Sequence, residues 1–181
     1  MKHAAQLNYQ IDMRPLMSSV IGPLRDYGKL QKYGKNLPGG AAMVASGWAA
    51  KNKSVSNADL FIDQLPSKLL ELERPYVIIL ELPASDVANP ILPAHRDYNK
   101  TCGINVYIDA NGEVTKFYNW NQEKRQSEYV EEFCANAGEI WAMDTDVPHS
   151  VTLVPNKARR MLSFCFTKTK YNEVVECFQT V

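Results

Sequence analysis

Two of the three histidines in the 181-residue chain lie close to carboxylates in a pattern that could hold a metal ion. His95 precedes Asp97 by two positions, and His149 follows the acidic segment 144–146. Because residues i and i+2 of a strand point to the same side of a sheet, His95 and Asp97 can bind one ion from a single strand end. His149 must then come from a facing strand.

Two imidazoles and one carboxylate on one face of an octahedral metal leave three coordination positions open. This donor set suits Fe(II), which can bind a cosubstrate and O2 at the open positions. The same ligands could instead hold Zn(II) and activate water for hydrolysis, although no H-E-x-x-H motif supplies a general base. A metal-free jelly-roll binding module, in which the pattern is accidental, is the third alternative. Asp144 and Asp146 are rival carboxylates near His149.

Further motifs accompany the histidines along the chain: Gly103-Ile-Asn-Val106, Gly138-Glu-Ile-Trp141, Pro148-His-Ser-Val151 and Arg159-Arg-Met-Leu-Ser163. Together with the H-x-D triplet, they resemble the Fe(II)/2-oxoglutarate-dependent dioxygenase superfamily. The resemblance is greatest to the branch of aspartyl/asparaginyl β-hydroxylases and free-proline hydroxylases. It covers about residues 76–167 and leaves the N-terminal section unexplained.

The resemblance implies a double-stranded β-helix in which His95, Asp97 and His149 bind Fe(II), with the rival aspartates outside the ligand set. It also implies 2-oxoglutarate and O2 as cosubstrates, and decarboxylation of 2-oxoglutarate to succinate and CO2. The hydroxylated partner would be a small-molecule amino acid or a side chain of a peptide or protein. Proline, aspartate and asparagine are all candidates.

Two adjacent arginines compete for the basic position that the resemblance implies for binding the distal carboxylate of 2-oxoglutarate. Strand alternation places Arg160 on the face of the bulky apolar positions 162, 164 and 166. Arg159 shares the other face with smaller residues, including Ser163, which are better suited to line a site. A guanidinium can pair bidentately with a carboxylate. We therefore predict that Arg159 binds 2-oxoglutarate and that Ser163 lines its site.

The strand after the H-x-D triplet departs from the family pattern. Relatives often carry a basic residue just before the Ile-Asn pair, whereas this chain has Cys102-Gly103. A second basic contact to 2-oxoglutarate is therefore not expected there. Asn105 shares a face with Gly103 and could donate a hydrogen bond to the cosubstrate instead. The alternative is that Asn105 faces water.

Charge and composition exclude several other classes of protein. Twenty basic and twenty acidic residues cancel and are interspersed, so no nucleic-acid partner is expected. The longest apolar stretch, 76–82, contains Glu81 and is too short to cross a bilayer, and no apolar signal core is present. The four cysteines lack C-x-x-C pairs, which indicates reduced thiols in a cytoplasmic protein. Cys134 and Cys165 are expected to be buried.

The N-terminal section, 1–73, is expected to form short helices and loops because its apolar positions recur at helical spacing between prolines. Ser56 and Asp59 resemble a capping box that begins a helix, which Pro66 should divide. His3 is expected to be exposed to solvent.

Seven short runs rich in Val, Ile, Tyr and Phe follow Pro75 and predict β-strands. They are 76–82, 91–95, 103–108, 114–118, 129–134, 139–143 with 147–154 behind it, and 159–167. Asn111-Gly112 predicts a tight hairpin with positive φ angles. The polar segment 119–127 predicts a loop that could cover a site.

These patterns predict one mainly β domain over residues 1–181. Its core, 74–168, would be a double-stranded β-helix, or jelly roll. The helices of the N-terminal support region would pack on the outer face of one sheet. Residues 169–181 are expected to be a C-terminal tail.

Overall fold

The computed structural model describes residues 2–18, 21–25, 51–82, 84, 91–97, 100–124 and 126–179, and this part contains eleven strands and four helices. The strands are β1 (Ala4–Gln6), β2 (Ile21–Arg25), β3 (Lys51–Val55), β4 (Tyr76–Leu82), β5 (Ile91–His95), β6 (Cys102–Asp109), β7 (Val114–Asn121), β8 (Gln126–Cys134), β9 (Ile140–Asp144), β10 (His149–Thr152) and β11 (Arg159–Phe166). The helices are α1 (Pro15–Ser18), α4 (Asp59–Ile62), α5 (Ser67–Leu72) and α6 (Tyr171–Gln179).

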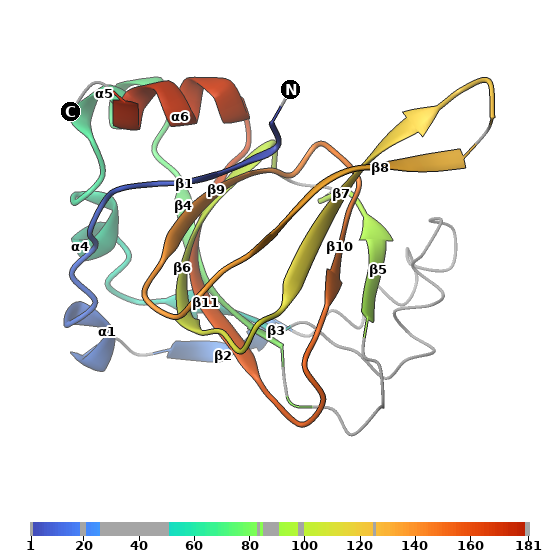
Figure 1. Ribbon diagram of the computed structural model, residues 1–181. Helices are drawn as coiled ribbons and strands as arrows, with labels where there is room; N and C mark the ends of the chain where they lie inside the picture. Colours follow the sequence, from blue (N-terminus) through green and yellow to red (C-terminus); the bar gives the residue numbers. More distant parts are fainter. Residues whose placement is uncertain are drawn as a thin grey trace.

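The strands pair in two antiparallel sheets that face each other (Figure 1). The large sheet has the order β1-β9-β6-β11-β4-β3-β2, and the small sheet has the order β5-β10-β7-β8. From β4 to β11 the chain passes repeatedly from one sheet to the other, and only β7 and β8 are successive strands of the same sheet. This topology is a double-stranded β-helix, so the predicted fold class is confirmed.

An apolar layer covers the outer face of the large sheet. Fully buried Leu162 and Phe164 of β11 contribute to one core cluster with Phe61, Leu69 and Val174 of the helices. Figure 1 shows α5 and α6 side by side over this sheet. The expected helical cover of one sheet face is therefore confirmed. No helix in the described ranges has the length and apolar character needed to cross a membrane.

A second cluster fills the space between the two sheets. It contains Tyr107, Met143 and Met161 from the large sheet and Phe117 and Phe133 from the small sheet. Their burial follows from alternation, because inward and outward positions differ by one residue along each strand. The clusters fix the two sheets against each other, and the candidate site lies on their inner faces.

The N-terminal section differs from its prediction. Strands β1 and β2 form the two edges of the large sheet and β3 lies between β2 and β4, where helices and loops were expected. Pro66 does separate two helices, as predicted. The prediction of a capping box is wrong, because the N-cap of α4 is Ala58 and no side chain caps this helix. Residues 171–179, expected in a tail, form α6, whose buried positions Tyr171, Val174 and Cys177 recur every three residues.

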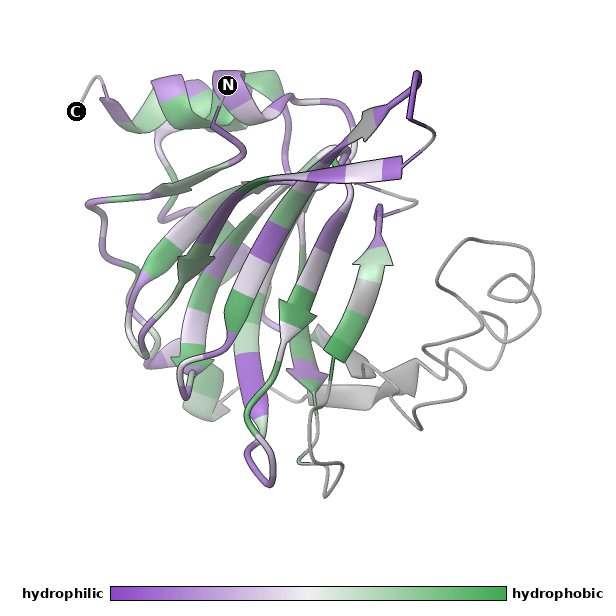
Figure 2. Ribbon diagram, turned by 45° about the vertical axis from the view of Figure 1, so that its right-hand side comes forward, coloured by the Kyte–Doolittle hydropathy of each residue, from purple (hydrophilic) through white to green (hydrophobic). Residues whose placement is uncertain are grey.

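Two further predictions, the hairpin at Asn111-Gly112 and the loop over 119–127, are also wrong. Only Gly112 of the Asn111-Gly112 pair has a positive φ, of 92°. The strands on either side of it belong to different sheets, so the turn connects the sheets and is not a hairpin. The expected loop 119–127 is mostly strand, because β7 and β8 extend into it. Their hairpin projects from the barrel and is largely hydrophilic toward its end (Figure 2).

His3 and Cys134 have the opposite environments to those expected. His3 is buried because β1 pairs with β9, which brings residue 3 beside Asp144 and Phe117. Cys134 is exposed at the end of β8, whereas Cys165 is buried as predicted. The position of His3 depends on pairing across about 140 residues, which no local pattern reveals.

Glu73 anchors the connection between β11 and α6, and its removal should destabilise the fold. Its carboxylate accepts hydrogen bonds from backbone N–H groups of Thr167, Lys168 and Thr169 and from both threonine hydroxyls. Burial alone would raise the pKa of Glu73, but these donors lower it to about 2. We expect Glu73→Gln to lower the free energy of unfolding by about 2 kcal/mol at pH 7.

The pH dependence of this difference follows from the sign of the shift. The ordinary pKa of 4.5 is lowered, so the stabilisation is fully present above pH 4.5 and is lost as the pH falls toward 2. Urea unfolding at several pH values measures it, with exposed Glu71→Gln as the matched control. A difference between wild type and Glu73→Gln that stayed constant from pH 7 to about pH 2 would contradict this role.

Candidate metal centre

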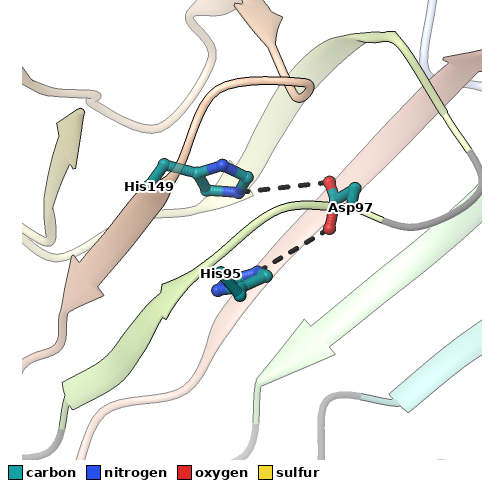
Figure 3. A group of neighbouring side chains, drawn as sticks. All are labelled: His95, Asp97 and His149. Atoms are coloured by element: carbon teal, nitrogen blue, oxygen red, sulfur yellow. Dashed lines mark ion pairs between the residues drawn. The ribbon is translucent and has the colours of Figure 1, made fainter. Parts of the chain in front are cut away.

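His95, Asp97 and His149 lie together at one end of the small sheet (Figure 3). Asp97 Oδ1 is 3.7 Å from His95 Nε2, and Asp97 Oδ2 is 4.0 Å from His149 Nε2. With metal–ligand bonds of about 2.1 Å, two ligands of one ion lie between about 3.0 and about 4.2 Å apart. Both separations fit one ion. The candidate ligand atoms of all three residues lie within 4.8 Å of one another.

Strand pairing explains this convergence. His149 is the first residue of β10 and is the direct partner of His95, the last residue of β5. Asp97 lies two residues beyond His95, where its backbone N–H donates to the Thr145 carbonyl at 3.1 Å. The centroids of the two imidazoles are 4.5 Å apart. The sheet therefore brings together the three residues that were predicted as ligands.

His149 is held with one nitrogen turned toward Asp97. Its Nδ1 lies 3.0 Å from the Val147 carbonyl oxygen. When Nδ1 donates this bond, the lone pair is on Nε2, the atom nearer Asp97. His149 is 4% exposed, and the centroid of its ring is 5.9 Å from that of Phe117. These contacts fix the tautomer and orientation that a metal ligand needs.

The protonation states of His149 and Asp97 at neutral pH also suit metal ligands. Burial lowers the pKa of His149 to about 4, although Asp97 opposes this shift. Burial would raise the pKa of Asp97, but its electrostatic interactions, first of all with Lys100, outweigh burial and lower the pKa to about 2. At pH 7, His149 is thus neutral and Asp97 ionised, the forms in which both residues bind metals.

Arg159 and Arg160 lie on opposite faces of β11, as strand alternation requires. Arg160 is exposed and pairs with Asp109 at 3.0 Å. Arg159 is 3% exposed, and its Nη2 donates to the Tyr107 hydroxyl at 2.9 Å. In the described part of the chain no carboxylate pairs with Arg159, and its Nε is the one buried side-chain nitrogen or oxygen without a hydrogen-bond partner.

Asn105 and Ser163 lie between Arg159 and the histidine cluster, on the inner faces of β6 and β11. Asn105 is 5% exposed, which excludes the alternative that it faces water. The Ser163 hydroxyl donates to Asn105 Oδ1 at 2.7 Å, and Asn105 Nδ2 contacts Met143 Sδ. The structure thus places both residues inside the barrel; their contact with a cosubstrate stays a prediction.

Lys100 and Thr145 are parts of the site that the sequence analysis missed. Lys100 Nζ lies 3.0 Å from Asp97 Oδ2, and the lysine side chain is only 16% exposed. The buried Thr145 hydroxyl donates to the Lys100 carbonyl at 2.9 Å, while its own carbonyl accepts from the Asp97 backbone. The spacing of Asp97 and Lys100 was the one available signal, but a lysine three residues from an aspartate is common at exposed sites.

The rival carboxylates lie outside the cluster. Asp144 pairs with His3 at 3.4 Å, and Asp146 pairs with Lys170 at 3.2 Å. Phe117 lies next to the cluster and is fully buried. Tyr118 is half-buried, with its hydroxyl 2.9 Å from the Ser150 hydroxyl.

No protein-family model and no curated protein matches the chain. Among solved structures, it is similar to a Pseudomonas putida prolyl-4-hydroxylase at 12% identity and a TM-score of 0.41, over 77% of this chain and 86% of that one. A 2OG-Fe(II) oxygenase-family oxidoreductase from Burkholderia pseudomallei matches at 13% identity and a TM-score of 0.36, over 52% of this chain and 44% of that one. Vicilin from hazelnut, Corylus avellana, matches at 12% identity and a TM-score of 0.40, over 66% and 30%.

The chain therefore spans less than half the length of the Burkholderia and hazelnut proteins. Similarity at this level assigns no family and carries no argument about activity. The strand topology and the geometry of the metal centre and Arg159 are what indicate a function for this chain.

Proposed function

We propose that this chain is an Fe(II)- and 2-oxoglutarate-dependent oxygenase that hydroxylates an amino acid or a peptide side chain. The observation that carries the proposal is the buried Arg159 guanidinium, whose Nε lacks a partner in the described part of the chain. A buried cation without a counter-charge is costly, so such a group is typical of a site for an anion.

A series of contacts connects Arg159 to the metal centre along the inner face of β6. Tyr107 accepts a hydrogen bond from Arg159, Asn105 accepts one from Ser163, and Gly103 lies next to Lys100. These β6 residues occupy alternate positions and therefore share one face. An anion that binds Arg159 with one end can extend along this face toward the metal ligands. A dicarboxylate whose second end chelates a metal has the required chemistry at both ends.

The residues of the chain supply binding and orientation in this proposal. When bound, Fe(II) would supply the chemistry by which O2 oxidises 2-oxoglutarate to succinate and CO2 and hydroxylates the substrate, so that one oxygen atom of O2 enters succinate and the other enters the substrate. His95, Asp97 and His149 would hold the ion, and Arg159 would bind the distal carboxylate. The apolar cluster around Phe117 excludes water from the inner side of the site.

Anaerobic titration tests this assignment without any knowledge of the substrate. We expect Fe(II) added together with 2-oxoglutarate to give the weak visible absorption of a chelated 2-oxoacid, and neither component alone to do so. Asp97→Asn should remove the absorption, whereas Asp146→Asn, which changes the rival carboxylate, should retain it. A wild-type protein that binds Fe(II) but gives no such absorption would contradict 2-oxoglutarate as cosubstrate and leave metal-dependent hydrolysis.

A further inference from the structure

Lys100 is a largely buried positive charge at a site that has to attract a metal cation. Its ammonium lies 3.0 Å from Asp97 Oδ2, the carboxylate oxygen that also faces His149. Its carbonyl is fixed by the Thr145 hydroxyl. The charge is weakly screened because the side chain is 16% exposed. A metal ion and Lys100 would therefore share the same carboxylate at short range.

Gly103 leaves space beside this ammonium. A Cβ atom on Gly103 would lie 3.9 Å from Lys100 Nζ and 3.8 Å from both Asn105 Oδ1 and Ser163 Oγ. These are ordinary van der Waals distances, so a Cβ atom would fit there. Because residue 103 is glycine, this space among the three polar groups is not filled by a side chain. Lys100 thus borders the same inner face of β6 along which the dicarboxylate is proposed to bind.

The net charge of the groups at the site determines what Lys100 does to ligand binding. The charges of Asp97 and Lys100 cancel when the histidines are neutral. A divalent ion alone adds two positive charges next to the ammonium, whereas an ion with a chelating dianion adds none. The ammonium therefore opposes the ion alone, but it attracts the end of the dianion that lies near the metal.

We propose that Lys100 makes metal binding depend on the anionic cosubstrate, by repelling the ion alone and pairing with the metal-proximal carboxylate of the ion–dianion complex. This inference rests on the proposed function, and it assigns Lys100 as a residue that couples the binding of the two ligands. By linkage, the ion and 2-oxoglutarate then strengthen each other's binding by the same factor.

Mn(II) binding, followed by the electron paramagnetic resonance of the free ion, tests this coupling without any turnover. In the wild type we expect 2-oxoglutarate to tighten Mn(II) binding by about 30-fold. In Lys100→Met we expect Mn(II) alone to bind about tenfold more tightly and the enhancement by 2-oxoglutarate to fall below about threefold. Lys100→Arg keeps the charge and should keep the coupling.

Lys124→Met is the matched control, because Lys124 is an exposed lysine of the β7–β8 hairpin that pairs with Glu128. It removes the same net charge away from the site and should behave as the wild type. If Lys100→Met does not fold, Lys100→Gln is measured against the same criteria. Weaker Mn(II) binding in the folded variant with an unchanged enhancement would show that Lys100 only positions Asp97, which overturns the inference and leaves the proposed function intact. A wild type that does not bind Mn(II) would overturn both.

Discussion

His149→Ala should weaken the binding of Mn(II) or Fe(II) by about 100-fold or more, because it removes one of three ligands from a preformed site. The strand pairing that places His149 opposite His95 is unaffected by the loss of a side chain. The variant should therefore fold as the wild type does and fail in metal binding alone. Calorimetric titration with the ion measures the affinity, and thermal unfolding without metal checks the fold.

His3 provides the matched control for this variant. Both imidazoles are buried and both approach the Phe117 ring, with centroid distances of 5.8 Å for His3 and 5.9 Å for His149. His3 pairs with Asp144 and lies outside the metal cluster. We expect His3→Ala to lower stability and to keep metal affinity within about twofold. Similar losses of metal affinity in the two variants would refute the assignment of the ligands.

Arg159→Ala should weaken the binding of 2-oxoglutarate to the metal-loaded protein by about 100-fold, because one carboxylate would lose its buried, charge-assisted partner. Metal affinity without the cosubstrate should change little, since Arg159 contacts Tyr107 and none of the three ligands. Titrating 2-oxoglutarate into the Mn(II)-loaded protein measures the effect.

Arg160→Ala is the matched control, because Arg160 lies on the opposite face of β11 from Arg159. Arg160 is exposed and paired with Asp109, so its loss should change 2-oxoglutarate affinity by less than about twofold. A greater loss at Arg160 than at Arg159 would contradict the proposed binding mode. Tyr107→Phe, which removes the hydroxyl that receives the Arg159 hydrogen bond, should cause an intermediate loss.

Most strands of the barrel could be predicted because they contain short runs rich in Val, Ile, Tyr and Phe closed by turn residues. Strand geometry also allowed the orientation of Arg159 to be predicted, since successive side chains of β11 point to opposite faces of the sheet. The N-terminal strands carried no such signal: β3 begins Lys51-Asn-Lys53 and gains its place by pairing with β4 on one side and β2 on the other. The pairing of these strands is set by the sheet on which they dock, and local propensity does not reveal it.

The candidate ligands could also be found from the sequence, because histidine is rare in this chain and the H-x-D spacing has a geometric meaning. Lys100 could not. Its low exposure depends on how Thr145 fixes the Lys100 carbonyl, which is a contact over 45 residues. His3 was missed for the same reason. Local spacing therefore identifies groups that can do chemistry, but tertiary packing decides which charges lie beside them.

The release of succinate from 2-oxoglutarate in the presence of Fe(II) and O2 tests the proposed activity most directly. We expect the wild type to produce succinate, and to produce it faster when the correct amino acid or peptide is added during a screen of such compounds. His149→Ala should produce none above the protein-free background, and His3→Ala should remain active. Equal succinate release by the wild type and His149→Ala would contradict the account.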